Sequence, residues 1–393
     1  MTGRNRKRLL VIAKTLLAGA LLAWVVSQVH WRDYVVSKSD GKAYAIGRVL
    51  PSAEAPQKLI LRTGFLWSSG TTAPRDLAEF VPLPNSAQVI QPGLASCIAD
   101  LKAALLAVAI GANLLMIPIL ALRWRLLLAT ARIDVSYWEA LRLTFLGQFF
   151  NTVVPGTVGG DLVKAYYVSK HTPNKAAALV SVMMDRVLGL TELTLLASVM
   201  LLVVWTAGLV PAGELRIPAT LVAIILSGMV AVFVFLFSGR VRQMLHLQKL
   251  YQRLPLAHHI ASAGEVTRLY RRNVASMVKA VLITVLIHVT WISSIFLTAA
   301  ALSLPTPWHV YFLYIPLIYT IGAVPLTPGG VGLVEKFYLV FFVTAACSPS
   351  RVLALALLVR LTPILVSLPG AVVAITGAKR PKTEAMEAEL GIK

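Results

Sequence analysis

Two long apolar stretches of this chain are interrupted by short segments rich in proline and glycine. The first interruption covers 150–161 and the second covers 325–335, and each ends in a carboxylate, Asp161 or Glu335. Inside a lipid bilayer a broken helix is tolerated only where protein or a water-filled cavity satisfies the freed backbone groups. Breaks at corresponding positions of two halves are typical of a binding site near the middle of the membrane.

The apolar stretches themselves indicate a membrane protein. Of the 393 residues, 57% are hydrophobic and 14% are charged, against about 25% charged residues in soluble domains. Several apolar runs exceed the ~18 residues that a membrane-spanning helix needs. The formal net charge of +20 does not indicate a nucleic-acid partner, because the basic residues gather in short loops. There they are topology signals and contacts for anionic lipids.

We expect an all-α polytopic membrane protein with about six full spans and two re-entrant broken-helix hairpins in an inverted-repeat-like arrangement. The basic segment 164–175 and the basic loop 239–273 are expected in the cytoplasm, since Lys and Arg favour that side. Both termini are then cytoplasmic, in a bacterial or archaeal cytoplasmic membrane. The expected spans are 9–29, 98–122, 176–210, 217–237, 275–304 and 352–375, and the expected hairpins are 138–163 and 311–342.

The stretch between the first two spans is polar, and its alternating runs 43–49 and 58–61 predict strands. We therefore expect a small β-rich extracytoplasmic insert there. The expected parts of the chain are a signal-anchor helix at 1–29, the insert at 30–97, a transmembrane domain at 98–378 and a cytoplasmic tail at 379–393.

Charged residues inside the apolar runs are the candidates for a binding site, because a charge at membrane depth costs on the order of 2.5–3.5 kcal/mol. Asp161 could cap the start of a helix, and Asp161 and Lys164 could line a polar cavity and meet a lipid headgroup; the two interpretations are compatible. Glu335 lies far from any expected loop, which favours a functional role. Adjacent helical residues point in different directions, so Asp185 and Arg186 are poor partners for each other, and Arg186 could reach Asp161 or a phosphate.

Other polar residues receive structural interpretations. Asn151 could cap or hydrogen-bond the broken backbone, and His288 is expected to be a packing residue whose polar groups are satisfied. Cys97 and Cys347 are expected to be independent thiols, since two cysteines are too few for a disulfide framework or a cysteine-rich metal site. The glycine-rich breaks lack the pattern of a phosphate loop, and neither a nucleophile motif nor a metal-ligand cluster is present. We expect no catalytic residues, metal or cofactor.

Three motifs in order give the chain a resemblance to the transmembrane region of lysylphosphatidylglycerol synthase, also called the flippase-like domain family. The resemblance covers most of 98–378, lacks the soluble aminoacyltransferase domain of the bifunctional relatives, and has Lys164 where the family commonly has Arg. It implies a protein that binds or translocates a lipid. The residues implied to line the path are Asn151, Pro155, Gly159, Gly160, Asp161, Lys164, Asp185, Arg186, Pro328, Gly329, Gly330, Gly332 and Glu335.

The leading hypothesis is a flippase-like integral membrane protein that translocates or binds a phospholipid, glycolipid or lipid-linked intermediate. Its partner would be an anionic or glycosylated membrane lipid, with no nucleic acid. One alternative is an integral-membrane transferase acting on a lipid phosphate, although only isolated carboxylates are present for such chemistry. Another is a non-catalytic partner of an envelope-lipid enzyme, with the insert as its docking surface.

Overall fold

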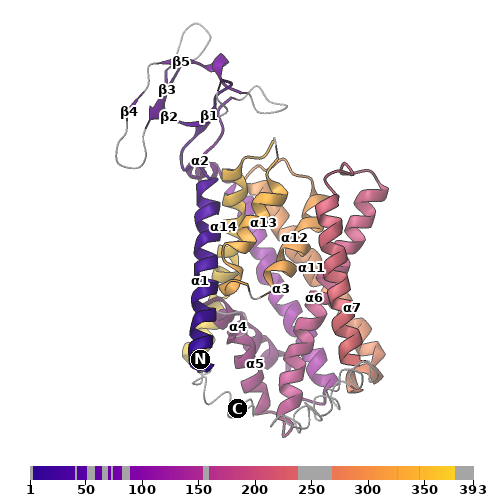
Figure 1. The fold of residues 1–393 in the computed structure, drawn as a ribbon. Helices are drawn as coiled ribbons and strands as arrows, with labels where there is room; N and C mark the ends of the chain where they lie inside the picture. The colour runs from indigo at the N-terminus through magenta and orange to yellow at the C-terminus, as the bar shows by residue number, and fades with distance from the viewer. Residues whose placement is uncertain are drawn as a thin grey trace. The chain divides into compact units, whose positions relative to one another are not determined.

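The computed structural model describes residues 3–39, 42–50, 58–63, 70–71, 74–81, 89–153, 159–237, 268–324, 326–344 and 346–376 (Figure 1). The chain divides into two compact units, and each is made of separate segments. The first unit comprises 1–108, 296–307 and 330–360, and the second comprises 109–295, 308–329 and 361–393. Pro155, most of the loop 239–273 and the tail 379–393 lie outside the described residues.

Helices dominate the part of the chain that the structure describes. Their bounds are α1 Gly3–Ser27, α2 Leu94–Ala99, α3 Ala103–Thr130, α4 Tyr137–Val153, α5 Gly159–Ser169, α6 Lys175–Thr206, α7 Arg216–Phe237, α11 Val274–Ala301, α12 Trp308–Gly322, α13 Leu333–Phe342, α14 Pro349–Val366 and α15 Leu368–Thr376. In the second unit α12 packs against α6 and α7, and α15 packs against α4. In the first unit α13 packs against α1.

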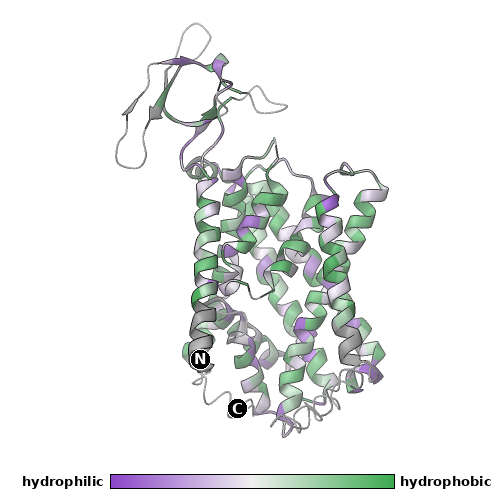
Figure 2. Ribbon diagram, viewed as in Figure 1, coloured by the Kyte–Doolittle hydropathy of each residue, from purple (hydrophilic) through white to green (hydrophobic). Residues whose placement is uncertain are grey.

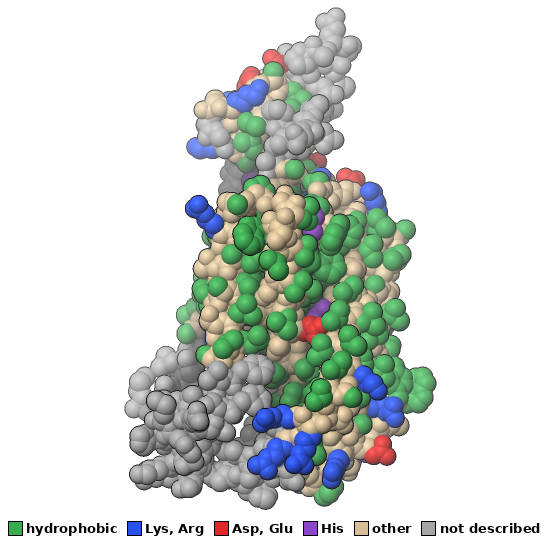
Figure 3. All heavy atoms as spheres, turned by 90° about the vertical axis from the view of Figure 1, so that its right-hand side faces the viewer, with side chains coloured by type: hydrophobic (Ala, Val, Ile, Leu, Met, Phe, Trp, Pro, Cys, Tyr) green, Lys and Arg blue, Asp and Glu red, His purple; other side chains and the backbone are tan. Residues whose placement is uncertain are grey.

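Four described helical stretches are long and apolar enough to cross a membrane: Ala103–Thr130, Lys175–Thr206, Val274–Ala301 and Pro349–Thr376. The apolar stretches at Ile12–Ser27 and Arg216–Ala231 are shorter. The protein is therefore a multi-pass helical membrane protein, while the full set of six spans stays a prediction. Figure 2 shows hydrophobic residues along the length of the long helices. The face drawn in Figure 3 is covered by hydrophobic side chains, with Lys and Arg gathered towards one end.

Helix α3 continues past 122, where we expected the second span to end at the Arg123-Trp124-Arg125 run. It ends at Thr130, and Arg123 is a buried residue within it, 4% exposed. The guanidinium of Arg123 is paired inside the protein with Asp185. The position of the membrane surface along α3 stays a prediction.

Five short strands lie between α1 and α2: β1 Tyr34–Val36, β2 Ala43–Leu50, β3 Lys58–Thr63, β4 Gly70–Thr71 and β5 Arg75–Asp76. Strands β1, β2 and β3 pair antiparallel in chain order, and β4 and β5 both pair with β3. Val35, Leu61 and Phe80 form their small buried core. The runs predicted to be strands lie within β2 and β3, while the extracytoplasmic position of this segment stays a prediction.

Helices α4 and α5 flank the first glycine-rich break and pack antiparallel to each other. Ser136 helps to begin α4 by accepting a hydrogen bond from the Glu139 N–H at 3.2 Å, as an N-cap does. Gly147 of α4 lies against Gly160 and Lys164 of α5. A Cβ on Gly160 would lie 1.8 Å from the Gly147 carbonyl oxygen. Only the absence of side chains at both positions lets the two backbones approach this closely.

The second break has the same order of elements as the first. An apolar helix (α12) is followed by a glycine-rich turn, a short helix (α13) and a long apolar stretch (α14 and α15), as α4 is followed by α5 and α6. Gly329, Gly330 and Gly332 have φ of 60°, 69° and 78°, a left-handed conformation that glycine adopts without strain. The re-entrant and inverted placement of these segments in a membrane stays a prediction.

Replacing Gly160 with alanine should destabilise the α4–α5 hairpin, because the new methyl group would collide with the backbone of α4. We expect Gly160→Ala to lower the midpoint of thermal unfolding in detergent by several degrees, or to prevent folding. The matched control is Gly111→Ala in α3, where a Cβ meets nothing within 4 Å and alanine favours the helix by about 1 kcal/mol. Equal midpoints for the two variants would contradict the close packing.

Candidate functional site

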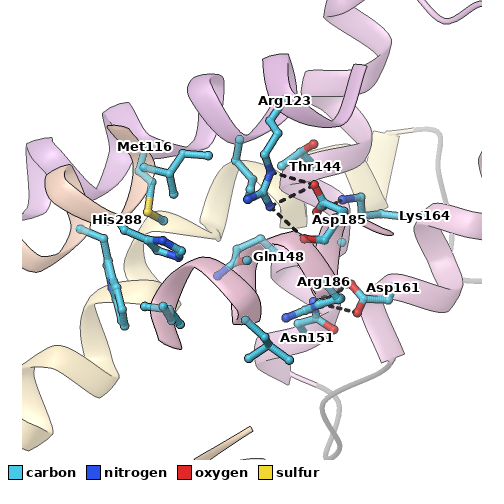
Figure 4. A pocket seen from close by; sticks show the side chains of 17 residues that line it. Met116, Arg123, Thr144, Gln148, Asn151, Asp161, Lys164, Asp185, Arg186 and His288 are labelled. Carbon is cyan, nitrogen blue, oxygen red and sulfur yellow. Dashed lines mark hydrogen bonds and ion pairs between the residues drawn. The ribbon is translucent and has the colours of Figure 1, made fainter. Parts of the chain in front are cut away.

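A cavity of about 230 Å³ lies in the second unit, at the α4–α5 hairpin (Figure 4). Its walls come from α3, α4, α5, α6 and α11. Five site residues predicted from the sequence line it: Asn151, Asp161, Lys164, Asp185 and Arg186. The charged and polar side chains that line it are Arg123, Thr144, Gln148, Asn151, Asp161, Lys164, Asp185, Arg186, His288 and Trp291.

Asn151 connects the end of α4 to the start of α5. Its Oδ1 accepts a hydrogen bond from the Gly160 N–H at 2.8 Å, which satisfies one of the free N–H groups at the start of a helix. Its Nδ2 donates to Asp161 Oδ1 at 3.4 Å. Asn151 therefore holds the broken backbone, as the sequence predicted, and at the same time orients the Asp161 carboxylate.

Asp161 forms a two-pronged ion pair with Arg186 of α6. The Nε of Arg186 lies 2.6 Å from Oδ2, and its Nη2 lies 2.9 Å from Oδ1. This is the geometry in which a guanidinium binds a carboxylate or a phosphate through two parallel hydrogen bonds. The Arg186 side chain is 53% exposed, whereas that of Asp161 is 14% exposed. Part of the guanidinium is therefore accessible beside the carboxylate that it binds.

Asp185, the residue before Arg186, points to different partners. Its Oδ1 accepts a hydrogen bond from Arg123 Nε at 3.0 Å and lies 3.0 Å from Nη2 of the same side chain. Its Oδ2 lies 3.8 Å from Lys164 Nζ. The Arg123 Nη1 also donates to Thr284 Oγ1 at 3.1 Å. One buried carboxylate therefore faces two buried cations.

Lys164 is also held by an aromatic ring. Its ammonium lies 3.9 Å from the centroid of the Trp124 ring, within the range of a cation–π interaction. Its side chain is 7% exposed, and its stem lies against Gly147. Lys164 is thus placed in the cavity wall by α5, and it provides a point charge where an arginine would provide a planar fork.

The rest of the cavity wall is neutral. His288 of α11 is 7% exposed, and its Nδ1 has no hydrogen-bond partner among the described residues. His288 is buried, as expected of a packing residue, but the prediction that its polar groups are satisfied does not hold for Nδ1 among the described residues. Gln148 and Trp291 lie with it in the cavity wall.

Glu335, Gly330 and Gly332 belong to the first unit and form a separate arrangement. Glu335 is 3% exposed, and its Oε2 accepts a hydrogen bond from the Gly332 N–H at 2.8 Å. Its Oε1 is paired with Arg360 of α14, whose Nη2 also donates to the Gly330 carbonyl at 3.4 Å. Gly332 packs against Ala18 and Leu21 of α1.

Sequence reasoning missed Arg123 and Arg360. Arg123 was taken as a membrane-surface marker, and Arg360 was overlooked inside the last apolar run. A signal for Arg360 was present, because Arg360 follows Glu335 by 25 residues, as Arg186 follows Asp161. Pro328 and Gly329 lie in the second unit but do not line the cavity described above, and no group of three potential metal ligands occurs among the described residues.

Residues 92–370 match the family described as the lysylphosphatidylglycerol synthase TM region. The chain is similar to a UPF0104 membrane protein of Methanothermobacter thermautotrophicus, with 26% identity over 257 residues that cover 60% of this chain and 74% of that protein. A UPF0104 membrane protein of Pyrococcus horikoshii is 33% identical over 93 residues, which cover 23% of this chain and 27% of that protein. The family match includes every residue that lines the cavity.

Replacing Asp185 with asparagine should destabilise the second unit, because Arg123 and Lys164 would lose their shared carboxylate. Removing one partner of a buried ion pair costs about 3–5 kcal/mol. We therefore expect Asp185→Asn to lower the midpoint of thermal unfolding in detergent by several degrees or more. The control is Glu139→Gln, which breaks an exposed pair with Arg142 worth about 0–1 kcal/mol. An unchanged midpoint for Asp185→Asn would mean that the pairing does not stabilise the fold.

Proposed function

Since the chain belongs to the family of the lysylphosphatidylglycerol synthase transmembrane region, we propose that it binds the headgroup of an anionic membrane lipid and translocates that lipid. The headgroup would enter the cavity at the α4–α5 hairpin, with its phosphate at Arg186. The protein would act as a transporter-like membrane protein without catalytic residues or a cofactor.

The observation that carries this proposal is the charge arrangement of the cavity. Three cationic side chains and two carboxylates line it, and the guanidinium of Arg186 is the cation most open to an anionic ligand. Charged residues are rare in the transmembrane segments of membrane proteins and are by default candidates for a functional site. Their pairing lowers the cost of burial but leaves part of the Arg186 guanidinium exposed beside a broken helix.

Arg186 is the side chain best placed to bind the phosphate. Its side chain is 53% exposed, more than that of any other charged residue paired in the cavity. The side chain of Arg123 is 5% exposed and is held by Asp185. The planar fork of Arg186 suits two oxygens of a phosphate as well as it suits the Asp161 carboxylate. A lipid phosphate could therefore exchange with Asp161 for the same nitrogens, so that the pair closes again when the lipid leaves.

The size of the cavity favours a headgroup over a whole lipid. Its volume of about 230 Å³ is below the range of roughly 300–1,000 Å³ that is usual for small-molecule pockets. The acyl chains would then stay in the bilayer while the polar group occupies the protein. This division of the ligand is what a translocator of amphipathic lipids requires.

The proposal includes the membrane arrangement expected from the sequence. We place six spans and two re-entrant hairpins in a cytoplasmic membrane, with both termini in the cytoplasm and the strands of 30–97 outside. The repeated order of elements supports corresponding halves, and each half pairs a carboxylate with an arginine 25 residues later. Breaks of this kind at equivalent positions are a feature of transporters built from inverted repeats.

Lipid exchange between leaflets tests the proposal directly. The purified protein is reconstituted into liposomes containing fluorescent anionic, zwitterionic or glycosylated lipids, and the loss of outer-leaflet fluorescence is followed after a quencher is added. We expect the wild type to accelerate exchange of an anionic lipid. Arg186→Gln should reduce the rate about tenfold or more, because a charge-assisted pair of hydrogen bonds is worth ~1.5–3 kcal/mol.

Arg142→Gln is the matched control, because Arg142 forms an exposed pair with Glu139 on α4 and does not line the cavity. Its exchange rate should stay within about twofold of the wild type. If folded wild-type protein exchanges none of the lipids, the translocation proposal is wrong. If Arg186→Gln and Arg142→Gln have equal rates, Arg186 is not the phosphate site.

A further inference from the structure

The neutral side of the cavity contains a polar group that the anion-binding proposal leaves unused. His288 Nδ1 is buried and has no hydrogen-bond partner among the described residues, although its side chain lines the cavity. Buried polar atoms in folded proteins nearly always have a partner, and an unpaired one costs free energy. A ligand hydroxyl or a water in the cavity would provide the missing partner.

Two further side chains make this side of the cavity suitable for hydroxyl groups. Gln148 contributes an amide, which both donates and accepts hydrogen bonds, as a neutral imidazole does. Trp291 follows His288 by three residues on α11, so the two lie on the same face of the helix. The Trp291 ring is held edge-on against Tyr319, with centroids 4.5 Å apart at 79°. An aromatic ring in a fixed orientation offers an apolar surface to the carbon skeleton of a polyol.

The neutral groups and the phosphate-binding groups share one cavity. In the view of Figure 4, Gln148 lies between His288 and the Arg186–Asp161 pair. All of these side chains line the same space of about 230 Å³. One headgroup could therefore contact the charged and the neutral residues at the same time.

We propose that the cavity selects lipids in which one phosphodiester joins a neutral polyhydroxyl group, such as a glycerol or a sugar, and that His288 and Gln148 bind its hydroxyls. This inference rests on the proposed function, because it assumes that a lipid phosphate binds at Arg186. It adds the chemical class of the headgroup, and His288 is the specificity-determining residue.

Two lipids of equal charge test the inference. Dioleoylphosphatidylglycerol and dioleoylphosphatidylmethanol both have a single phosphodiester charge, but the methanol headgroup has no hydroxyl. Binding of each lipid to purified full-length protein in detergent is measured by native mass spectrometry or by a titration of intrinsic fluorescence. We expect the wild type to bind the glycerol lipid about tenfold more tightly, as one or two hydrogen bonds predict.

Variants assign the preference to its residues. His288→Phe keeps a ring but removes both nitrogens. This variant should bind the two lipids with about equal affinity, because binding of the glycerol lipid weakens while binding of phosphatidylmethanol is unchanged. His288→Asn keeps an amide near the position of Nδ1 and should retain part of the preference. Gln148→Leu should reduce the preference independently. His309→Ala is the control, because His309 lies on α12 and does not line the cavity.

The outcomes separate this inference from the proposed function. Equal wild-type binding of the two lipids, with both bindings lost in Arg186→Gln, would overturn the hydroxyl selection and leave the anion site intact. If the wild type binds neither lipid, both the hydroxyl selection and the anion site are overturned. A wild-type preference that survives in both His288→Phe and Gln148→Leu would overturn the assignment to this side of the cavity.

Discussion

The structure of the second unit depends on the burial of charged side chains that can be stable only in pairs. Asp185 is the centre of this arrangement, since it faces Arg123 at 3.0 Å and Lys164 at 3.8 Å. These three residues come from α6, α3 and α5. Because an unpaired charge at this depth is costly, the pairing holds three helices together around the cavity. Within this trio, one carboxylate faces two cations.

The broken helix adds a second constraint, which is the need to satisfy free backbone groups. Asn151 accepts from the Gly160 N–H, while Gly147 and Gly160 let the two helices touch. Asp161 then lies in the first turn of α5, where the helix dipole favours a carboxylate. Its two-pronged pair with Arg186 is thus a consequence of the same local fold. The residues that satisfy the broken backbone therefore also position the charged side chains of the cavity.

Two sets of contacts point to an internal repeat in the chain. Asp161 and Arg186 are 25 residues apart, and so are Glu335 and Arg360. Between α3 and α11, Asn113 bonds to Ser294 and Arg123 bonds to Thr284. Thr284 follows Asn113 by the same number of residues as Ser294 follows Arg123, so the two contacts are reciprocal. Reciprocal contacts are those that a two-fold relation between similar segments produces.

The sequence by itself determined the membrane class, the family, the positions of the two breaks and four of the five charged residues that line the cavity. These features depend on apolar length and on local motifs, which a single chain segment contains. Only the tertiary structure decided the partners of the charges: Asp185 with Arg123 and Lys164, and Glu335 with Arg360. It also showed that Arg123 is buried and that His288 Nδ1 is unpaired among the described residues. Such pairings join residues that are far apart in the chain, so they follow from helix packing and not from any local pattern.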